Sequence, residues 1–182
     1  MILATQRLRL REMTDGDFTQ LCAIMQDPQA MVAYEGAFDD RMTRDWLQRM
    51  EQRYRQDGFG LWAVVLAGTD EMIGQCGLTR QRILGEDVIE VGYLFNRAYW
   101  HRGYAMESAR ACRDYAFDSL GVERLYAQVR DMNIASMNVA IRLGMTVRGR
   151  FEKDSRGVRM PHFAFAVDRD DRAGSARSDE RG

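Results

Sequence analysis

A junction between a strand and a helix gives the clearest sign of ligand binding in this sequence of 182 residues. A predicted strand at residues 88–95 leads through a short loop into a helix that begins near residues 102–105. Gly103 lets the backbone approach a ligand closely there, and the first helical turn presents free N–H groups and the positive end of the helix dipole. Arg97 and Arg102 add positive charge. The pattern suits a phosphate group, although a plain helix start has the same sequence features, and it fits neither a P-loop nor a dinucleotide-binding fingerprint.

A second segment with polar side chains that could bind a ligand begins at Asn133. It follows a predicted strand at residues 123–130 and opens a predicted helix. The amide of Asn133 could cap that helix or bind an amide group of a ligand. Ser136 lies one turn later on the same helix face. Capping and helix-surface filling explain both residues when the segment is considered alone.

The strands and helices that must position these residues alternate along the chain. Alternating charged and aliphatic residues at 8–11 predict a strand with one buried face. Further strands are predicted at residues 58–67, 72–84, 88–95, 123–130, 145–152 and 158–167. Helices are predicted at residues 15–26, 43–56, 104–120 and 133–143, with a loop or short helix at 30–40. This order predicts an α/β fold with a mixed central sheet.

Length and composition indicate a single globular domain. The sequence is 46% hydrophobic and 29% charged, with a net charge of −1, and a chain of this length can bury a core without disulfides. We expect the domain to span residues 1–167. Residues 168–182 hold almost no apolar side chains and cannot offset the entropy lost on ordering, so we expect this tail to be disordered.

The same composition argues against several classes of protein. A near-zero net charge without a basic stripe disfavours nucleic-acid binding, and no apolar run approaches the ~20 residues that span a bilayer. The N-terminus lacks the apolar block of a signal peptide. Three widely spaced cysteines and two histidines form no metal-binding pattern. We therefore expect reduced thiols, a cytoplasmic location, no metal, and neither a membrane nor a nucleic-acid partner.

Taken in order, the segments resemble the GNAT acetyltransferase superfamily. The pyrophosphate motif of that family, Q/R-x-x-G-x-G/A, has the same frame as WHRGYA at residues 100–105. Trp100 stands where most members have Gln or Arg. This departure is familiar in the RimJ/RimL-like N-acetyltransferases, whose typical YWG-x-GYA-x-EA is similar to the sequence here up to Glu107.

Two further segments are similar to the same branch. The branch carries N-x-x-S followed by Leu-Gly-Phe, and residues 133–145 match this pattern except that Met145 replaces Phe. TQRLRLRE at residues 5–12 looks like its opening strand. The resemblance extends over residues 5–167. It implies the GNAT fold, an α/β fold with a central, mixed, mostly antiparallel sheet of about six to seven strands flanked by about four helices.

The resemblance implies acetyl-CoA as the acetyl donor. In the family, amides at the helix start hold the pyrophosphate. A backbone N–H near the end of the preceding strand polarises the thioester carbonyl, which here means Leu94 or Phe95. Asn133 would hold the pantetheine arm. Together with Arg97, the predicted cofactor-binding residues are Leu94, Phe95, His101, Arg102, Gly103, Tyr104, Ala105 and Asn133.

Acetyl transfer needs a neutral amine, because an ammonium group has no lone pair. The pKa of an alkyl amine is about 10 and that of an α-amine about 8, so a base or a chain of waters must take the proton. Glu90 is the first candidate because it lies in the strand beside the predicted cleft, although a solvent-facing strand residue paired with an arginine also fits its position. Glu35 is the second candidate, and Glu152 and Asp154 are the third.

The resemblance also bears on the leaving CoA thiolate. Many GNAT members protonate it with a tyrosine seven residues after the position of Asn133, where this sequence has Ala140. We therefore expect Ser136 to act as the general acid or as a hydrogen-bond donor to the sulfur.

The acceptor is predicted to be a primary amine, either of a small molecule or of a protein N-terminus. The resemblance implies that the loop after the first helix, the second helix and the final hairpin form the acceptor side, with the candidate residues Tyr34, Glu35, Phe38, Trp62 and His162. Core packing is the alternative for these residues; it is the preferred interpretation for Trp62 and stays open for Tyr34. The loop is acidic at Glu35, Asp39 and Asp40, which suits a cationic amine such as an amino acid, a polyamine or an aminoglycoside.

Two questions stay open. A CoA-binding sensor or structural subunit without turnover is the alternative function. The resemblance also allows either a monomer or a homodimer.

Overall fold

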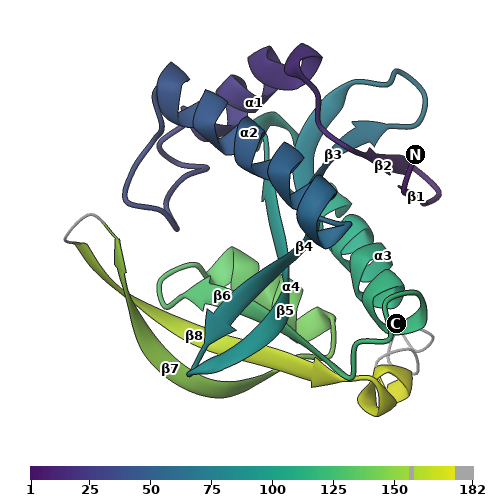
Figure 1. Ribbon diagram of the computed structural model, residues 1–182, viewed down its shortest axis with the longest axis vertical. Coiled ribbons are helices and arrows are strands. Elements are labelled where there is room, and N and C mark those ends of the chain that lie inside the picture. The colour runs from purple at the N-terminus through teal and green to yellow at the C-terminus, as the bar shows by residue number, and fades with distance from the viewer. Residues whose placement is uncertain (156–157, 175–182) are drawn as a thin grey trace.

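A computed structural model describes residues 1–155 and 158–174 as one mixed sheet flanked by helices (Figure 1). Within this part, the eight strands lie in the order β1-β2-β3-β4-β5-β6-β8-β7. Their bounds are β1 Leu3–Ala4, β2 Leu8–Arg11, β3 Leu61–Leu66, β4 Met72–Ile83, β5 Glu86–Phe95, β6 Arg124–Arg130, β7 Thr146–Ser155 and β8 Val158–Asp168. All neighbours are antiparallel except β5 and β6, which run parallel. The predicted α/β fold is confirmed, and the two-residue β1 is added to the seven strands predicted from the pattern.

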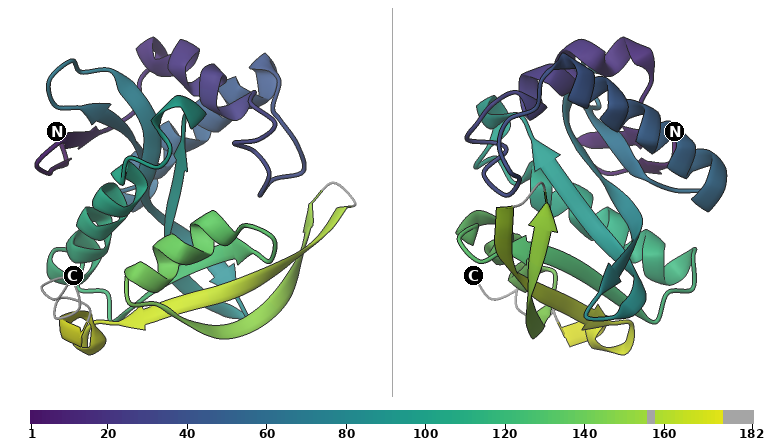
Figure 2. Two further views of the ribbon diagram at one scale, coloured as in Figure 1. Left: turned by 180° about the vertical axis from the view of Figure 1, so that it is seen from behind. Right: turned by 60° about the vertical axis from the view of Figure 1, so that its left-hand side comes forward.

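Helices cover both faces of the sheet (Figure 2). The α-helices are α1 Phe18–Met25, α2 Asp40–Asp57, α3 Tyr104–Asp118 and α4 Ile134–Arg142, and short 3₁₀ helices span Asp15–Asp17, Arg97–Tyr99 and Asp170–Gly174. One hydrophobic core lies between the sheet and the pair α3 and α4, and a second lies beneath α1 and α2. No helix among the described residues is long and apolar enough to cross a bilayer.

Strand β3 divides its side chains between the two cores. Trp62 and Val64 belong to the core under α3, whereas Leu61, Ala63 and Val65 belong to the core under α1 and α2. Successive strand residues point to opposite faces, so a continuous apolar run is what a strand covered on both faces requires.

The sheet opens between β5 and β6. Strand β5 pairs with β4 over ten positions, from Glu86 to Phe95. Its described pairing with β6 is limited to Ile89 with Leu125 and Glu90 with Tyr126. Beyond Glu90 the two parallel strands diverge, and β6 continues against β8 as far as Arg130. The last five residues of β5 therefore have a partner strand on one side and a gap on the other.

The segment before α2, predicted as a loop or a short helix, is a loop with turns from Pro28 to Glu35. Helix α2 begins three residues earlier than its apolar pattern predicts because Asp39 caps it. The Asp39 carboxylate accepts a hydrogen bond from Met42 N at 2.7 Å, and the Thr43 hydroxyl donates to Asp39 O at 2.8 Å. Asp39 thus satisfies a free N–H of the first turn.

Strand β8 ends at Asp168 and a 3₁₀ helix follows at Asp170–Gly174, within the first residues of the predicted tail. Asp168 is the last residue of β8 and pairs with Arg124, and Arg172 pairs with Asp118 at 2.7 Å. These ion pairs hold the residues after 167 against the domain, and a low apolar content does not reveal them. Residues 175–182 of the predicted tail lie outside the described residues.

Candidate active site

A cavity of about 470 Å³ lies where β5 and β6 diverge. Its walls come from the loop before α2, from α2 itself, from the ends of β4, β5 and β6, from the start of α4 and from the β7–β8 hairpin. The cavity brings together Tyr34, Glu35, Phe38, Glu90, Leu94, Asn133, Ser136 and His162, all of which the sequence predicted as site candidates. Its volume falls within the ~300–1,000 Å³ typical of small-molecule sites.

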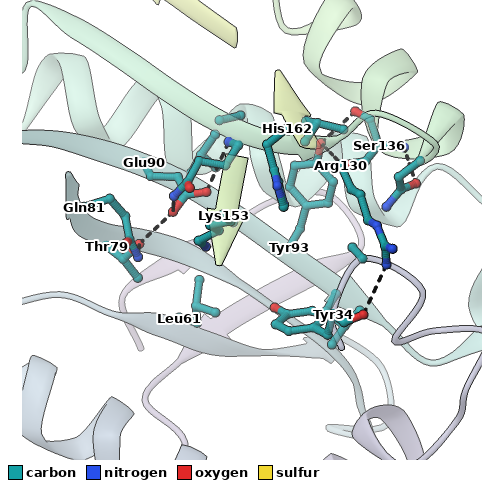
Figure 3. A pocket seen from close by; sticks show the side chains of 18 of the residues that line it. Tyr34, Leu61, Thr79, Gln81, Glu90, Tyr93, Arg130, Ser136, Lys153 and His162 are labelled. Atoms are coloured by element: carbon teal, nitrogen blue, oxygen red, sulfur yellow. Dashed lines mark hydrogen bonds between the residues drawn. The ribbon is translucent and has the colours of Figure 1, made fainter. Parts of the chain in front are cut away.

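Glu90 is a half-buried carboxylate in this cavity (Figure 3). It accepts hydrogen bonds from Gln128 N at 3.2 Å, from Gln128 Nε2 at 3.1 Å and from the Thr79 hydroxyl at 3.3 Å. Burial raises the pKa of Glu90 above its usual value, and the nearby Lys153 and the hydrogen bonds only partly oppose this effect. A carboxylate with a raised pKa is a better proton acceptor near neutral pH.

Ser136 and Tyr93 share a pair of hydrogen bonds across the gap. The Ser136 hydroxyl donates to Tyr93 Oη at 3.0 Å, and Tyr93 Oη donates to the Ser136 carbonyl at 3.0 Å. Burial raises the pKa of Tyr93, so the phenol stays protonated and remains a donor. The side chain of Asn133 caps α4 by accepting from Ser136 N at 3.1 Å. This bond uses only its oxygen, so capping and ligand binding through the nitrogen are compatible.

His162 is buried on the hairpin side of the cavity, and Figure 3 shows its ring directed inward. Its Nδ1 lies 2.8 Å from Met160 O, and its ring stacks on Phe151. Because a carbonyl only accepts, Nδ1 must carry the proton, which leaves the Nε2 lone pair unprotonated in the neutral ring. Burial lowers the pKa of His162 and favours that neutral form.

An aromatic wall closes the side of the cavity beneath α2. Tyr34, Phe38 and Trp46 contact one another edge to face, with ring centroids 6.0–6.1 Å apart. Trp46 Nε1 donates to the side-chain oxygen of the buried Gln75 at 2.9 Å. These contacts hold the loop before α2 over the cavity.

Four basic side chains also line the cavity: Arg49, Arg53, Arg130 and Lys153. The acidic residues that line it are Glu35 and Glu90. Asp39 and Asp40, which the sequence grouped with Glu35, are engaged elsewhere: Asp39 caps α2, and Asp40 accepts from Gln26 at 2.6 Å. The lining of the cavity is therefore more basic than the loop sequence indicates.

The start of α3 lies beyond the end of β5, outside the residues that line the cavity. Gly103 precedes the helix in the left-handed conformation, with φ of 80°, and His101 also has a positive φ of 60°. The amides of the first helical turn have no partner within the helix and form a place for an anion. Arg102 is exposed, with its guanidinium 5.6 Å from the centre of the Tyr99 ring.

The N-terminal strand region holds this turn in place through Arg7. Arg7 Nη1 donates to Arg102 O at 3.0 Å, its guanidinium lies 4.6 Å from the centre of the Tyr104 ring, and it forms an ion pair with Glu107 at 2.6 Å. Partial burial raises the pKa of Glu107, but hydrogen bonds from Thr5 and Arg7 outweigh that effect, so its pKa is lowered. Arg7 thus neutralises the acidic side chain in the first turn of α3.

Two residues predicted for the site have other contacts. Trp62 is 1% exposed, packs edge to face against Tyr115 in the core under α3 and does not line the cavity, so it is removed from the acceptor residues. The Arg97 side chain pairs with Asp27 at 2.8 Å and with Gln29 at 2.9 Å. Arg97 therefore neutralises Asp27 in the loop after α1 and is not free to bind a phosphate.

Backbone geometry distinguishes Leu94 from Phe95. Asn96 N donates to Ile73 O of β4 at 2.9 Å. Because N–H groups in an antiparallel strand alternate in direction, Leu94 also faces β4, whereas the N–H groups of Phe95 and Tyr93 face the gap. The gap thus offers unpaired amides from Phe95 and Tyr93 along the edge of β5.

The sequence matches the family model for the acetyltransferase (GNAT) domain over residues 7–146. The chain belongs to the GNAT family of N-acetyltransferases. The family uses acetyl-CoA as acetyl donor. The predicted resemblance to its RimJ/RimL-like branch is confirmed.

Curated relatives and solved structures agree with this assignment. The chain is 40% identical over 144 residues to the uncharacterized protein YkkB of Bacillus subtilis, covering 79% of this chain and 84% of that protein. It is 29% identical to the uncharacterized N-acetyltransferase YnaD of the same organism, covering 84% and 87%. A crystal structure of an acetyltransferase from Agrobacterium tumefaciens superposes with a TM-score of 0.77 at 29% identity, covering 91% of this chain and 92% of that chain.

Sequence reasoning missed the side chains that complete this GNAT cavity. Tyr93 was not among the predicted site residues, because the family tyrosine is expected from α4. Arg49, Arg130 and Lys153 come from three separate elements, so no local spacing connects them. One sequence feature could have identified two of the basic side chains. Arg49 and Arg53 lie three and seven residues after Trp46, so all three side chains share one face of α2.

We expect Arg7→Gln to weaken CoA binding about ten-fold, because the substitution releases the Arg102 carbonyl and leaves the Glu107 charge beside the phosphate position. Isothermal titration calorimetry with CoA measures the effect. Arg9→Gln is the matched control, since Arg9 is an exposed residue of β2 only two positions after Arg7. Equal CoA affinities for the two variants would contradict the role of Arg7.

Proposed function

We propose that this GNAT protein transfers the acetyl group of acetyl-CoA to a primary amine by direct attack in a ternary complex. The observation that carries the proposal is the position of Glu90 and of the Tyr93–Ser136 pair in one cavity, at the open edge of β5. A proton acceptor and a proton donor are the two groups that aminolysis of a thioester needs.

The chain's residues would divide the binding of the donor between two places. The amides of Arg102, Gly103, Tyr104 and Ala105 at the start of α3 would hold the pyrophosphate. The free amides along the edge of β5 and the Asn133 side chain would hold the pantetheine arm as an added strand. This arrangement places the thioester at the cavity, with the N–H of Phe95 or Tyr93 as donor to its carbonyl oxygen.

The reaction then requires two proton movements. The neutral amine attacks the carbonyl carbon, a C–N bond forms, and the C–S bond breaks. Glu90 takes the proton of the amine, directly or through water, and Tyr93 gives its phenolic proton to the departing thiolate. Ser136 stabilises the phenolate by donating a hydrogen bond to it. The products are the N-acetylated amine and free CoA.

A thermal-shift measurement followed by a thiol-release assay tests the function. We expect acetyl-CoA at 100 times its Kd to stabilise the protein by about 2.7 kcal/mol, and free thiol to appear with a primary amine. Stabilisation without thiol release for any class of amine would replace the proposal by the alternative, a CoA-binding protein without turnover. The absence of stabilisation by CoA or acetyl-CoA would contradict both.

We expect Glu90→Gln to lower kcat/KM about 100-fold, the usual contribution of a general base. In the native enzyme, kcat/KM should fall as the pH drops through the raised pKa of Glu90, above the ordinary carboxyl range, because the protonated form accepts no proton. The variant should lose that acidic limb. Glu86→Gln is the control, since Glu86 is an exposed residue at the start of the same strand.

The same variant should not lose stability near neutral pH. A carboxyl whose pKa is raised by folding is more costly to keep ionised in the folded state than in the unfolded state, so glutamine removes a penalty present at neutral pH. A thermal-unfolding midpoint well below that of the native protein would assign Glu90 a structural role. If rate and pH profile were unchanged, His162 would become the candidate base, with His162→Gln as the next variant.

We expect Ser136→Ala and Tyr93→Phe each to lower kcat about ten-fold while the Kd for acetyl-CoA stays within about two-fold, because a thiolate leaves tolerably without help. The double variant should lose little more than the worse single variant, since the two hydroxyls form one unit. Single-turnover kinetics isolate the chemical step. Two fully active variants with chemistry rate-limiting would refute the proton-donor role.

A further inference from the structure

The basic lining of the cavity has no counterpart in the acetyl-transfer chemistry described above. Among the described residues, Arg49, Arg53, Arg130 and Lys153 form no ion pair, although all four line the cavity. Most arginines elsewhere are paired, as in Arg7–Glu107, Arg11–Asp17, Arg80–Asp57, Arg97–Asp27 and Arg124–Asp168. Four basic side chains without an ion pair among the described residues thus line one cavity.

Helix α2 presents two of these charges together with the aromatic wall. Trp46, Arg49, Met50 and Arg53 all line the cavity and recur at helical spacing. The Arg49 guanidinium lies 5.3 Å from the centre of the Trp46 ring, so the tryptophan restrains its position. Arg53 Nη1 donates only a long hydrogen bond, 3.4 Å, to Arg80 O. Both guanidinium groups keep donors for another acceptor.

Arg130 adds an unsatisfied donor on the opposite side. Its Nη1 donates to Val32 O at 2.6 Å and to Tyr34 O at 3.2 Å, which joins the end of β6 to the loop before α2. Its Nε is buried and has no hydrogen-bond partner among the described residues. A buried guanidinium nitrogen without an acceptor is costly, so an oxygen acceptor is expected there.

Arg53 and Lys153 lie at the level of Glu90, away from the α3 start, because Arg53 donates to the carbonyl of Arg80, the register partner of Ile89, and Lys153 is close to Glu90. Arg130 lies further along the gap, level with Leu94. Glu90, which lines the cavity with Arg49 and Arg53, precedes Phe95 by five strand residues, or about 17 Å. The turn at His101–Ala105 begins only after Phe95 and the following 3₁₀ helix. The pantetheine arm of the donor is uncharged, so the basic side chains beside it are available to the acceptor.

We propose that the acceptor is a small primary amine that also carries an oxyanion, a carboxylate or a phosphate, which the Arg49, Arg53, Arg130 and Lys153 side chains bind while its amine meets Glu90. This inference rests on the proposed function and names the substrate class for the same cavity. Guanidinium groups bind both oxyanions in the same fork geometry. The cavity volume of about 470 Å³, shared with the pantetheine arm, suits a small acceptor.

The positive charge of the cavity also disfavours two of the predicted acceptors, polyamines and aminoglycosides. Polyamines and aminoglycosides carry several positive charges, which the four basic side chains repel. An unmodified protein N-terminus lacks a nearby carboxylate unless an acidic side chain follows it. Free amino acids and aminoalkyl phosphates combine an amine with an oxyanion a few bonds away.

Matched pairs of acceptors test the inference by thiol release. Each proteinogenic amino acid is compared with its α-amide, O-phosphoethanolamine is compared with ethanolamine, and spermidine represents the polycations. The amide has the more readily deprotonated amine, so a preference for the carboxylate cannot come from amine ionisation. We expect the oxyanion-bearing member of at least one pair to react at least ten-fold faster in kcat/KM. The amino acid and phosphate pairs distinguish the two oxyanions.

Substitutions on α2 locate the oxyanion. Arg49→Gln and Arg53→Gln should each lower kcat/KM for the preferred acceptor about ten-fold and change kcat/KM for its uncharged partner less than two-fold, with KM for acetyl-CoA unchanged. Arg41→Gln is the matched control, because Arg41 lies on the same helix with its side chain 90% exposed, outside the cavity. Calorimetry with CoA-saturated protein measures binding of the same acceptors without turnover.

The outcomes separate the two proposals. Faster reaction of amides, ethanolamine, spermidine or amidated peptides overturns the inference and leaves acetyl transfer in place. A rise in KM for acetyl-CoA in Arg49→Gln also overturns it, because the side chain would then bind the donor. If no amine releases thiol, binding of the oxyanion-bearing amine that is lost in Arg49→Gln still supports the inference while the proposed catalytic function fails.

Discussion

The separation of β5 from β6 after Glu90 is the constraint on which the rest of the site depends. Two parallel strands that stayed paired would satisfy the amides of Tyr93 and Phe95 and fill the space between them with side chains. Their divergence leaves a strip of backbone with hydrogen-bonding capacity on one side of a cavity. On the other side β5 pairs with β4 at all ten of its positions, from Glu86 to Phe95. Pairing with β4 holds β5 in place on one side, and β5 can therefore lack a partner strand on the other.

The elements around this opening have distinct physical tasks. The cores under α1 and α2 and under α3 and α4 fix the sheet from both faces. Arg7 connects the first strands to the turn before α3, and Arg130 connects the end of β6 to the loop before α2. Each arginine holds backbone carbonyls of a segment that has no sheet partner of its own. The residues near the reaction are therefore held by side chains that do no chemistry themselves.

The sequence predicted the local features well and the long-range ones poorly. The helix start at Gly103 and the cap at Asn133 depend on neighbouring residues, so their motifs located them within one or two residues. Trp62 was misplaced because a strand covered on both faces gives an unbroken apolar run, which does not reveal the direction of any side chain. The Tyr93–Ser136 hydrogen bond joins residues 43 positions apart. Hydrophobic content likewise does not reveal the ion pairs of Asp168 and Arg172, which lie after residue 167.

The net charge of the sequence also gave no indication of the charge in the cavity. The total of −1 conceals a surface of paired charges and a cavity whose basic lining exceeds its acidic lining. Nearby positive groups disfavour a second positive charge, so Lys153 and Arg130 lower the pKa of any amine that enters the cavity. They also favour negative charge on the carbonyl oxygen during attack. Lys153, the only lysine of the sequence, in addition opposes the rise in the pKa of Glu90 that burial causes. The basic side chains that would bind an oxyanion therefore also make it easier for Glu90 to deprotonate the amine. The same side chains would serve both recognition and catalysis.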